Sequence, residues 1–499
     1  MTPERKQLME ETRIRISEEY SRIRSLNRLN PQLEGSIFEL LTRRVTKCYG
    51  VRSYFVATLY RYIQKKAEQE GLELARRPEQ LFTTQLPFVA EGIITVQYLE
   101  NQILDSKENT RGCAKEAQRL RDQKLLSSHY LKDFLYEYID LHILPDDPKA
   151  NRRVTRTVRR IFQYVDIGQM VQDEWGTSDW FEKGHKNELP ISEEIDTFIG
   201  RDIVRTYWRT INNQHRFEEG QGQFVRNYLR RVYLTSGALF VLMAELVMDI
   251  LQYEGQAKRD ILNMAASIGL IGQISNDIVD FFPHGTVSKN PQDVFADIRN
   301  DVVTLPLALY LGSENAHGLD DLRLDADVAL REINRHLAEA IPGLLLYKNL
   351  SACLLQAVNI AGELRTESQT YFDLDIPEGI LLEDMNSVVC TKYNPTLRRL
   401  IPLLNTLSQT RGNAVQQPSK PAASTRPLSY TQPSTHHDNR PASFQTAEIP
   451  APGVSERIST ASGRQVFQHA ARPLADGGGK RPVRGRYEIF IADQHRRPE

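Results

Sequence analysis

The stretch Gln273–Phe282, QISNDIVDFF, places polar and acidic residues inside a run that is otherwise apolar. On a helix, Gln273, Asp277 and Asp280 stand at i, i+4 and i+7, and Asn276 flanks the same face. Two carboxylates one turn apart repel each other, and in apolar surroundings each costs several kcal/mol unless something positive faces it. The positive group is either an Arg or Lys from a neighbouring helix or a hard divalent cation such as Mg2+. These residues alone leave both alternatives open.

The rest of the chain favours one large helical domain. Of the 499 residues, 40% are hydrophobic and 25% are charged, which is an ordinary globular composition. Apolar residues recur at helical spacing through about the first 400 positions, and alternation with a period of two is scarce. We therefore predict an all-α domain over residues 1–408, without internal repeats. Helices are expected near residues 4–27, 34–48, 51–70, 85–106, 113–143, 153–175, 192–215, 222–252, 257–282, 322–341 and 346–370.

The carboxyl-terminal part of the chain has a different composition. From residue 409 onward, Pro, Ser, Thr, Gln, Ala and Arg dominate without periodicity, so residues 409–499 are predicted to be a disordered tail. Its last stretch, RGRYEIFIADQHRRPE, contains a short apolar motif at 486–492 between basic residues. This motif is either an apolar tail with no specific partner or a docking motif that becomes ordered on a protein partner.

Charge and cysteine spacing exclude several classes of protein. The net charge is -1 and the body before the tail is mildly acidic, so a nucleic-acid-binding core is not indicated. The four cysteines have no metal-ligand spacing and are interpreted as reduced thiols of a cytosolic protein. The amino-terminal sequence MTPERKQLMEETRIR has no apolar signal-peptide core. We therefore expect a cytoplasmic location.

One apolar window has the length of a membrane span. It covers Val232–Leu251 and contains Glu245 and Asp249. Each of these acids would cost about 2.5 to 3.5 kcal/mol at the centre of a bilayer. We therefore expect a buried helix of the large domain rather than a span, and no stable membrane insertion.

The residues that follow the opening stretch add a second pattern. A polar loop with Lys289 is followed by DIRNDVVTLPLALYL, in which Asp297 precedes the TLP sequence at 304–306. This order closely resembles the second aspartate-rich region of the trans-prenyl diphosphate synthases, where FQxxDDxxD is followed by a loop Lys and then by DLxxGKxTLP. The resemblance implies the isoprenoid synthase fold, an all-α helical bundle around a central cavity that class I terpene cyclases share.

Four upstream segments resemble other motifs of this family, in the family's order. Ala90–Gly112 is similar to the first aspartate-rich helix, and Ile167–Glu174 to a GQxxD element. Thr235–Phe240, TSGALF, is similar to KTxxLF, and Tyr49–Phe55 to GKRxRP. The resemblance covers about residues 30–312 and is moderately specific, because no single element decides it. An extra helix is expected in residues 175–215.

The family resemblance implies a Mg2+-dependent enzyme that ionises an allylic prenyl diphosphate. In the family, two acidic helices face each other and hold Mg2+ on the diphosphate, which stabilises charge on the leaving group. The carried-over catalytic residues are Asp277, Asp280 and Asp105, and the metal ligands are Asn276, Asp277, Asp280, Asn101 and Asp105. The carried-over diphosphate-binding residues are Arg52, Arg111, Gln169, Gln273 and Lys289.

The first aspartate-rich motif departs from the family pattern. At the DDxxD positions the chain has Asn101, Gln102 and Asp105, so only one of the family's carboxylates is present. Glu100 and Glu108 are close enough in sequence to compensate in part. Amide oxygens bring no charge to attract Mg2+, so we expect weaker metal binding than in a standard member.

Basic residues of the family pattern are also missing. Val51, Thr235 and Val302 stand where the family has Lys. In the family, many of these groups bind isopentenyl diphosphate, so we expect binding of this co-substrate to be impaired here. One alternative is a class I terpene cyclase that acts on a single prenyl diphosphate. Another is a catalytically impaired regulatory subunit of a prenyl synthase, and the resemblance further implies a homodimer.

Overall fold

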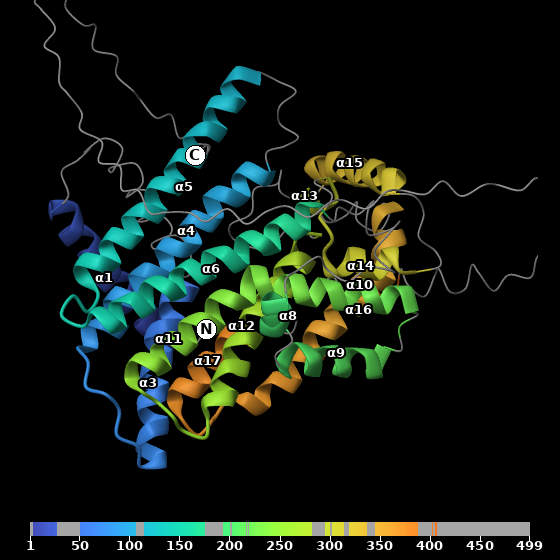
Figure 1. Cartoon of the computed structure of the whole chain (residues 1–499). Coiled ribbons are helices and arrows are strands. Elements are labelled where there is room, and N and C mark those ends of the chain that lie inside the picture. Colours follow the sequence, from blue (N-terminus) through green and yellow to red (C-terminus); the bar gives the residue numbers. More distant parts are fainter. Residues whose placement is uncertain are drawn as a thin grey trace, which may run out of the picture. The chain divides into compact units, whose positions relative to one another are not determined.

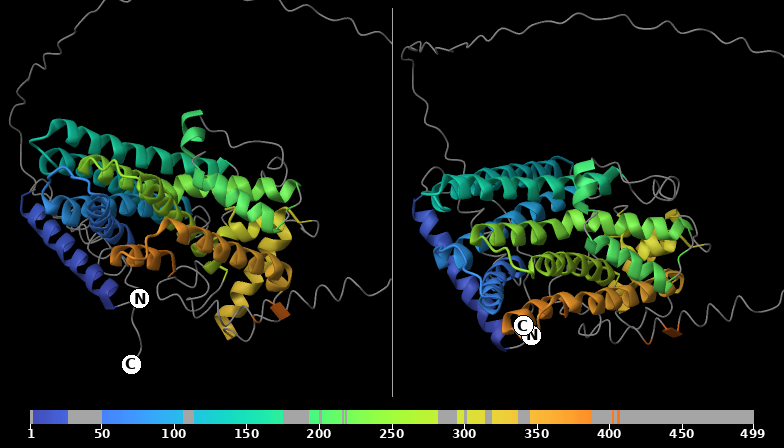
Figure 2. Two further views of the ribbon diagram at one scale, coloured as in Figure 1. Left: turned by 90° about the horizontal axis from the view of Figure 1, so that it is seen from below. Right: turned by 60° about the horizontal axis from the view of Figure 1, so that its bottom comes forward.

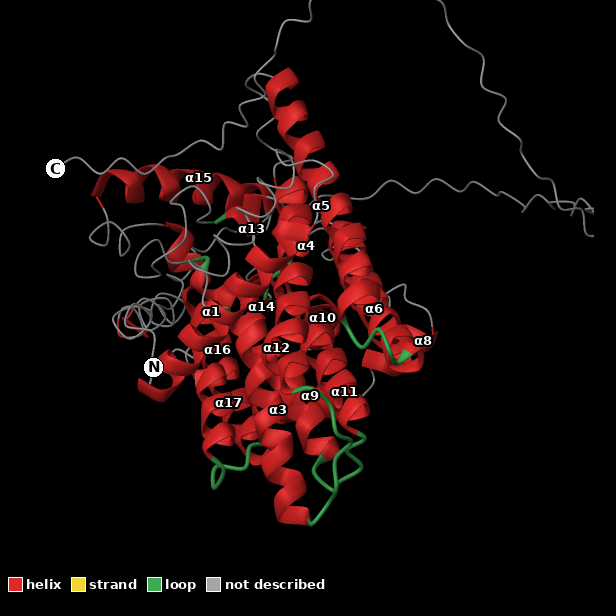
Figure 3. Cartoon of the chain, turned by 90° about the vertical axis from the view of Figure 1, so that its left-hand side faces the viewer, coloured by secondary structure: helices red, strands yellow, loops and turns green. Residues whose placement is uncertain are grey.

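The structure is a computed structural model in which the described residues are all helices and their connections. Described are residues 3–26, 50–105, 114–174, 193–199, 202–215, 217, 219–281, 295–299, 302–313, 319–336, 345–387, 402 and 405–406. The chain divides into two compact units, Met1–Gln417 and Pro418–Glu499, and the described residues belong to the first. Within them every regular element is a helix (Figure 3), which confirms the all-α prediction. The predicted tail and the predicted helix at 34–48 lie outside the described residues.

The described helices agree with most of the predicted ranges. They are α1 (Pro3–Leu26), α3 (Val51–Glu70), α4 (Leu86–Asp105), α5 (Ala114–His142), α6 (Pro148–Glu174), α8 (Glu193–Ile199), α9 (Asp202–His215), α10 (Glu219–Val232), α11 (Ala238–Leu251), α12 (Lys258–Val279), α13 (Ala296–Arg299), α14 (Leu305–Leu311), α15 (Leu319–His336), α16 (Leu345–Ser368) and α17 (Pro377–Ser387). A 3-10 turn, η7 (Gln369–Tyr371), follows α16. The segment predicted as one helix at 192–215 forms α8 and α9, while α13, α14 and α17 were not predicted.

Two short π-helical segments interrupt the regular helices. The first, η1 (Leu81–Gln85), leads into α4, and the second, η3 (Tyr233–Gly237), joins α10 to α11. A π segment contains one more residue per turn than an α-helix, and such segments are frequent at functional sites. The second one overlaps the TSGALF motif at residues 235–237, so it positions residues that the sequence analysis singled out.

Local sequence signals explain where several helices begin and end. At the end of α3, Gly71 adopts a left-handed conformation with φ of 66°, which glycine tolerates without a Cβ clash. The amide of Leu72 then donates to the carbonyl of Ala67 at 2.8 Å. Helix α14 carries Pro306 in its first turn, where the missing N–H has no intrahelical partner to lose.

Helix α12, which carries the opening stretch of sequence, is surrounded by other helices. It packs against α9, α10, α11, α14, α16 and α17 and against η3 (Figure 1). A second set, α3, α4, α5, α6 and α11, forms a closed circuit in which each helix contacts the next and α11 contacts α3 (Figure 2). Polar side chains on the inner faces of α12 are therefore removed from water, and each needs a partner.

Glycines allow α6 and α12 to approach η3 closely. A Cβ added at Gly269 of α12 would lie 2.6 Å from the carbonyl oxygen of Ser236. A Cβ added at Gly168 of α6 would lie 2.7 Å from the side chain of Thr235. Real Cβ atoms do not approach other atoms so closely, so both positions require glycine for this packing. The segment η3 is therefore held between two helices.

The apolar window that was compared with a membrane span is largely enclosed by protein. In the described part of the chain, Gln221–Leu251 is the one helical stretch long and apolar enough to cross a membrane, and 78% of its most apolar window is buried. The α11 residues Leu239, Val241 and Met243 are at most 2% exposed. This burial agrees with the prediction that the window is a core helix of the large domain.

Candidate functional site

The centre of the candidate site is Asp277, which is 3% exposed on α12. The hydroxyl of Tyr228 on α10 donates to its Oδ2 at 2.7 Å. The Nε2 of Gln273, one turn earlier on α12, donates to its Oδ1 at 2.6 Å. The Oε1 of Gln273 accepts a hydrogen bond from Ser236 Oγ of η3 at 2.9 Å. Both carboxylate oxygens of Asp277 are therefore bonded within the protein.

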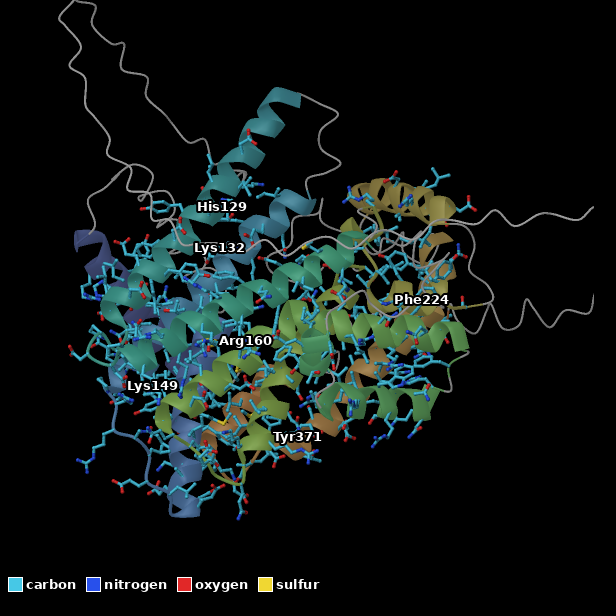
Figure 4. The ribbon with its side chains drawn as sticks, in the orientation of Figure 1. His129, Lys132, Lys149, Arg160, Phe224 and Tyr371 are labelled. Atoms are coloured by element: carbon cyan, nitrogen blue, oxygen red, sulfur yellow. The ribbon has the colours of Figure 1, made fainter. Side chains whose placement is uncertain are left out.

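Arg231 lies beside this network and is itself held in place. It follows Tyr228 by one turn of α10, and its guanidinium carbon is 5.5 Å from the centroid of the Tyr228 ring. Its Nη2 donates to the carbonyl of Val303 at 2.8 Å, and its Nη1 donates to Oε1 of Gln172 on α6. Arg231 is 4% exposed. In Figure 4, the label of Phe224 marks α10, the helix that supplies both Tyr228 and Arg231.

These contacts join segments that are far apart in the sequence. Gln172 belongs to the GQxxD-like element, Ser236 to the TSGALF element, and Asp277 to the second aspartate-rich stretch. Val303 directly precedes the TLP sequence. The fold therefore brings four of the motif-like segments into one polar cluster around the buried Asp277. Before the structure, only the family resemblance connected these segments.

The electrostatics of the cluster are dominated by burial. The pKa of Asp277 is raised to about 7, first by burial and second by the negative charge of Asp297 on α13. Arg231 and the hydrogen bonds from Tyr228 and Gln273 lower this pKa but do not offset the rise. Burial and the neighbouring Asp277 raise the pKa of Tyr228 well above its ordinary value, so its hydroxyl remains a proton donor.

The predicted residues on α12 differ in their surroundings. Asn276 is exposed, Asp280 and Gln273 are half-buried, and Asp277 is buried. Asn276 and Asp280 are one turn apart on the same face of the helix. Helix α12 therefore offers an amide and a carboxylate near solvent, and a second carboxylate inside.

The predicted first acidic motif lies at the end of α4 and is only partly described. Asn101 is half-buried, whereas the side chains of Gln102 and Asp105 lie outside the described residues, as do Arg111, Glu108 and Lys289.

Glu100, a candidate for compensating the missing acids, has a cationic partner. Lys132 of α5 is labelled in Figure 4. Its Nζ lies 2.8 Å from Oε1 of Glu100 and 3.6 Å from Oδ2 of Asp166 on α6. The ammonium group also lies 4.9 Å from the centroid of the Phe162 ring. Glu100 therefore contributes to an ion-pair network between helices, and a metal ion would have to compete with Lys132 for it.

The remaining predicted diphosphate contacts are on α3 and α6. Arg52, in the first turn of α3, is half-buried with its guanidinium carbon 5.8 Å from the centroid of the Phe240 ring. Gln169 is half-buried on α6, about one turn before Gln172. The next residue after Arg52, Ser53, donates its amide to Oε1 of the buried Glu91 on α4 at 3.0 Å.

Sequence reasoning missed Tyr228 and Arg231, two central members of the cluster. The available signal was the pair Arg230 and Arg231 directly before an apolar helix, because a buried arginine requires polar partners. Their spacing to Tyr228 is helical, but nothing in the sequence states that α10 crosses α12 at Asp277.

The residues of α12 differ in how open they are to a metal ion. Mg2+ prefers oxygen ligands, and Asn276, Asp277 and Asp280 all carry side-chain oxygens. Each carboxylate oxygen of Asp277 accepts one hydrogen bond and keeps a second lone pair. Among the described residues, no group of three His, Cys, Asp or Glu is placed to hold a metal ion. The oxygens of α12 therefore have the chemistry that Mg2+ requires, and a complete site would need ligands from another helix.

Comparisons with known proteins give structural neighbours of low sequence identity. No protein-family model and no curated protein matches the chain. A geranylgeranyl pyrophosphate synthetase from the archaeon Geoglobus acetivorans has a TM-score of 0.46 and 12% identity, covering 78% of this chain and 99% of that chain. The enzyme of that name from Pyrococcus horikoshii has a TM-score of 0.46 and 16% identity, covering 77% and 98%.

A third neighbour is a decaprenyl diphosphate synthase from Rhodobacter capsulatus, with a TM-score of 0.45 and 15% identity, covering 77% of this chain and 97% of that chain. At these values the comparison concerns the course of the chain only, and the site rests on the contacts described above. The chain is similar to these three structures in its all-α fold.

Proposed function

We propose that this chain is a prenyltransferase that acts on an allylic prenyl diphosphate. The observation that supports the proposal most directly is the convergence of four motif-like segments around Asp277. Segments that merely resembled a family by chance would have no reason to meet in space. The cluster is polar and buried within a core of apolar helices, which is the setting that ionisation of an allylic diphosphate requires.

Two helices would supply the ligands of a metal ion. Asn276, Asp277 and Asp280 from α12, with Asn101 and Asp105 from α4, would hold Mg2+. When bound, Mg2+ supplies positive charge that stabilises the departing diphosphate. Mg2+ dependence therefore belongs to the proposal.

The chain's own residues provide the rest of the chemistry. Arg52, Arg111 and Lys289 would bind the diphosphate by charge-assisted hydrogen bonds. The α12 side chains of Ile274 and Ile278 are fully buried and provide apolar surroundings next to the polar cluster. Such surroundings exclude water, which would otherwise capture an allylic cation.

The missing lysines argue against chain elongation. Val51, Thr235 and Val302 are half-buried and uncharged at positions where the family has Lys. Without these cations, binding of a second diphosphate would be weak. We therefore propose that the acceptor of the prenyl group is not isopentenyl diphosphate.

A product assay tests the proposal. Purified full-length protein is incubated with Mg2+ and farnesyl or geranylgeranyl diphosphate, with and without isopentenyl diphosphate, and the products and released inorganic diphosphate are measured. Without an acceptor the allylic cation can only be captured by water or lose a proton, so we expect slow release of diphosphate together with the linear prenyl alcohol or a linear alkene. This release should be lost in Asp280→Ala and retained in the control Asp260→Asn, an exposed acid on the same helix. A longer diphosphate would establish elongation, and a cyclic hydrocarbon or alcohol would establish a terpene cyclase. Absence of any turnover would refute the enzyme proposal.

Two features of α12, the amide at Asn276 and the hydrogen bonds to Asp277, favour a second candidate function. In this alternative the chain is a catalytically impaired regulatory subunit. Asn276 is the exposed residue where the family has its first acid, and Asp277 is held by Tyr228 and Gln273. In that case the chain would retain the fold and modulate an active partner. Absence of turnover together with an altered product pattern of an added active prenyl synthase would support this candidate.

Several further predictions concern assembly and location. A homodimer, docking of the motif at 486–492 on a protein partner, and a cytoplasmic location stay predictions. Sedimentation of the full chain would show whether it is a homodimer. Sedimentation of a chain that ends before residue 409 would show whether association with another protein depends on the tail.

A further inference from the structure

We propose that Arg231 of α10 binds the diphosphate group of the allylic substrate, with its Nε donating to a phosphate oxygen. This residue lies outside the segments that the motifs singled out. The proposal rests on the proposed function, because it names a further residue for the same substrate. It concerns binding alone, so it can be tested without turnover.

The hydrogen bonds of Arg231 leave one of its donors without an acceptor. Arg231 is 4% exposed, its Nη1 donates to Gln172, and its Nη2 donates to the carbonyl of Val303 at 2.8 Å. In the described part of the chain, its Nε is buried and has no acceptor. A buried N–H group without an acceptor is unfavourable, so an oxygen from a bound molecule would stabilise this arrangement.

The acceptors of Arg231 carry no charge to balance its own. They are the side-chain amide oxygen of Gln172 and a backbone carbonyl oxygen. Arg5, which is 3% exposed, instead has the Asp384 carboxylate at 2.6 Å. A buried cation is unfavourable unless an anion pairs with it. Guanidinium donors match phosphate oxygens in geometry and charge, so a phosphate group suits Arg231.

Two carboxylates near Arg231 act against an anion. Asp297 raises the pKa of Asp277 and Arg231 lowers it, so all three groups share one electrostatic environment. The guanidinium carbon also lies 5.5 Å from the centroid of the Tyr228 ring. Asp277 is one of the proposed metal ligands, and a bound cation would compensate part of this negative charge. We therefore expect diphosphate to bind more tightly at Arg231 when Mg2+ is present.

Arg231 lies beside two positions at which the family pattern has Lys. It is bonded to the carbonyl of Val303, the neighbour of Val302, and Thr235 follows it by one turn. The Thr235 hydroxyl donates to the Arg231 carbonyl at 3.3 Å. Val302 and Thr235 are half-buried and uncharged. Arg231 thus supplies a positive charge to a region that lacks both lysines, and one cation there agrees with a reaction that uses a single diphosphate.

Calorimetric titration of the full-length chain with inorganic diphosphate, with and without Mg2+, tests the proposal. In Mg2+, Arg231→Gln should weaken binding about 10-fold to 100-fold, as expected for the loss of a charge-assisted hydrogen bond. Arg231→Lys keeps the charge but not the planar set of donors, so it should recover part of this loss. The matched control is Arg226→Gln, which changes an exposed arginine of the same helix and should leave the affinity unchanged.

Equal affinity of Arg231→Gln and wild type would overturn the proposal, and so would the absence of diphosphate binding to the wild type in Mg2+. Either result would indicate that a water molecule satisfies Nε.

Thermal unfolding with and without diphosphate separates binding from a structural role. If Arg231 only supports the packing, its variants unfold at a lower temperature but keep the full rise in Tm that diphosphate causes, which would overturn the proposal. A smaller rise than in the wild type supports it. If Arg231→Gln does not fold, Arg231→Lys is used for both measurements. Diphosphate binding that depends on Arg231 in a chain without turnover would refute the proposed function and leave this inference standing, so the two failures are distinguishable.

Discussion

The burial of Asp277 predicts how the stability of this domain changes with pH. The substitution is Asp277→Asn, which keeps the shape of the side chain and removes its titration. The carboxyl of Asp277 has an ordinary value of 3.8 and a pKa raised to about 7 in the fold, chiefly by burial. The unfolded chain therefore releases this proton at a lower pH than the folded chain does.

The sign and the size follow from linkage. Below about pH 4, Asp277 is protonated in both states and contributes no pH dependence. Between about pH 4 and 7, the unfolded state binds fewer protons than the folded state, so stability falls as pH rises through this window. The interval between 3.8 and about 7 corresponds to at most about 4 kcal/mol of unfolding free energy, at 1.36 kcal/mol per pH unit.

The assay is urea unfolding of the wild type, Asp277→Asn and the control Asp260→Asn at several values between pH 4 and pH 8. We expect the stability difference between Asp277→Asn and wild type to shift by about 2 to 4 kcal/mol in favour of the variant across this range. Asp260 is exposed on the same helix, so its variant should track the wild type. Parallel curves for Asp277→Asn and wild type would refute the argument that the buried carboxyl keeps its proton near neutral pH.

Three further predictions follow from the packing and hydrogen bonds. Gly269→Ala should lower stability by about 1 to 3 kcal/mol in thermal unfolding, because its Cβ would meet a backbone oxygen at 2.6 Å. The matched control Gly272→Ala has nothing within 4 Å of the new Cβ and should be neutral or slightly stabilising, so equal losses in both would contradict the close approach. Tyr228→Phe should cost about 1 to 3 kcal/mol in urea unfolding at pH 8, since the ionised Asp277 loses a donor, and an unchanged midpoint would count against this bond. Arg5→Met should cost about 1 to 3 kcal/mol because it removes the guanidinium that lies 2.6 Å from the Asp384 carboxylate of α17. A double-mutant cycle with Asp384→Asn that gives no coupling energy would contradict this contribution.

The long helices were predictable because their periodicity extends over many turns. Helix α3 spans 51–70 as predicted, and α5 runs from Ala114 to His142 against a predicted 113–143. The short helices α13 and α14, of four and seven residues, are too short for a period of 3.6 to be recognised. In α14, Pro306 also resembles a helix breaker until its place in the first turn is known.

The candidate site was predictable only along single helices. Helical spacing placed Gln273 one turn before Asp277, and the two are hydrogen-bonded. The same spacing did not determine which carboxylate is buried, because it places both carboxylates on one polar face and does not state which helix packs against that face. The contact of Tyr228 with Asp277 depends on how α10 crosses α12, which is a tertiary property. Residues that act across two helices were therefore missed, while residues on one helix were found.

The π segment η3 has a consequence for comparing this chain with any relative. Tyr233–Gly237 accommodates one residue beyond a regular α-helix, and each residue of an α-helix advances the direction of the side chain by about 100°. A homologous chain with an uninterrupted helix here would align correctly only after a one-residue gap. Deletion of a single residue within 233–237 would restore a regular α-helical turn and leave Tyr228 and the apolar face of α11 in register. We therefore expect an alignment with homologous chains to show a one-residue insertion within residues 233–237.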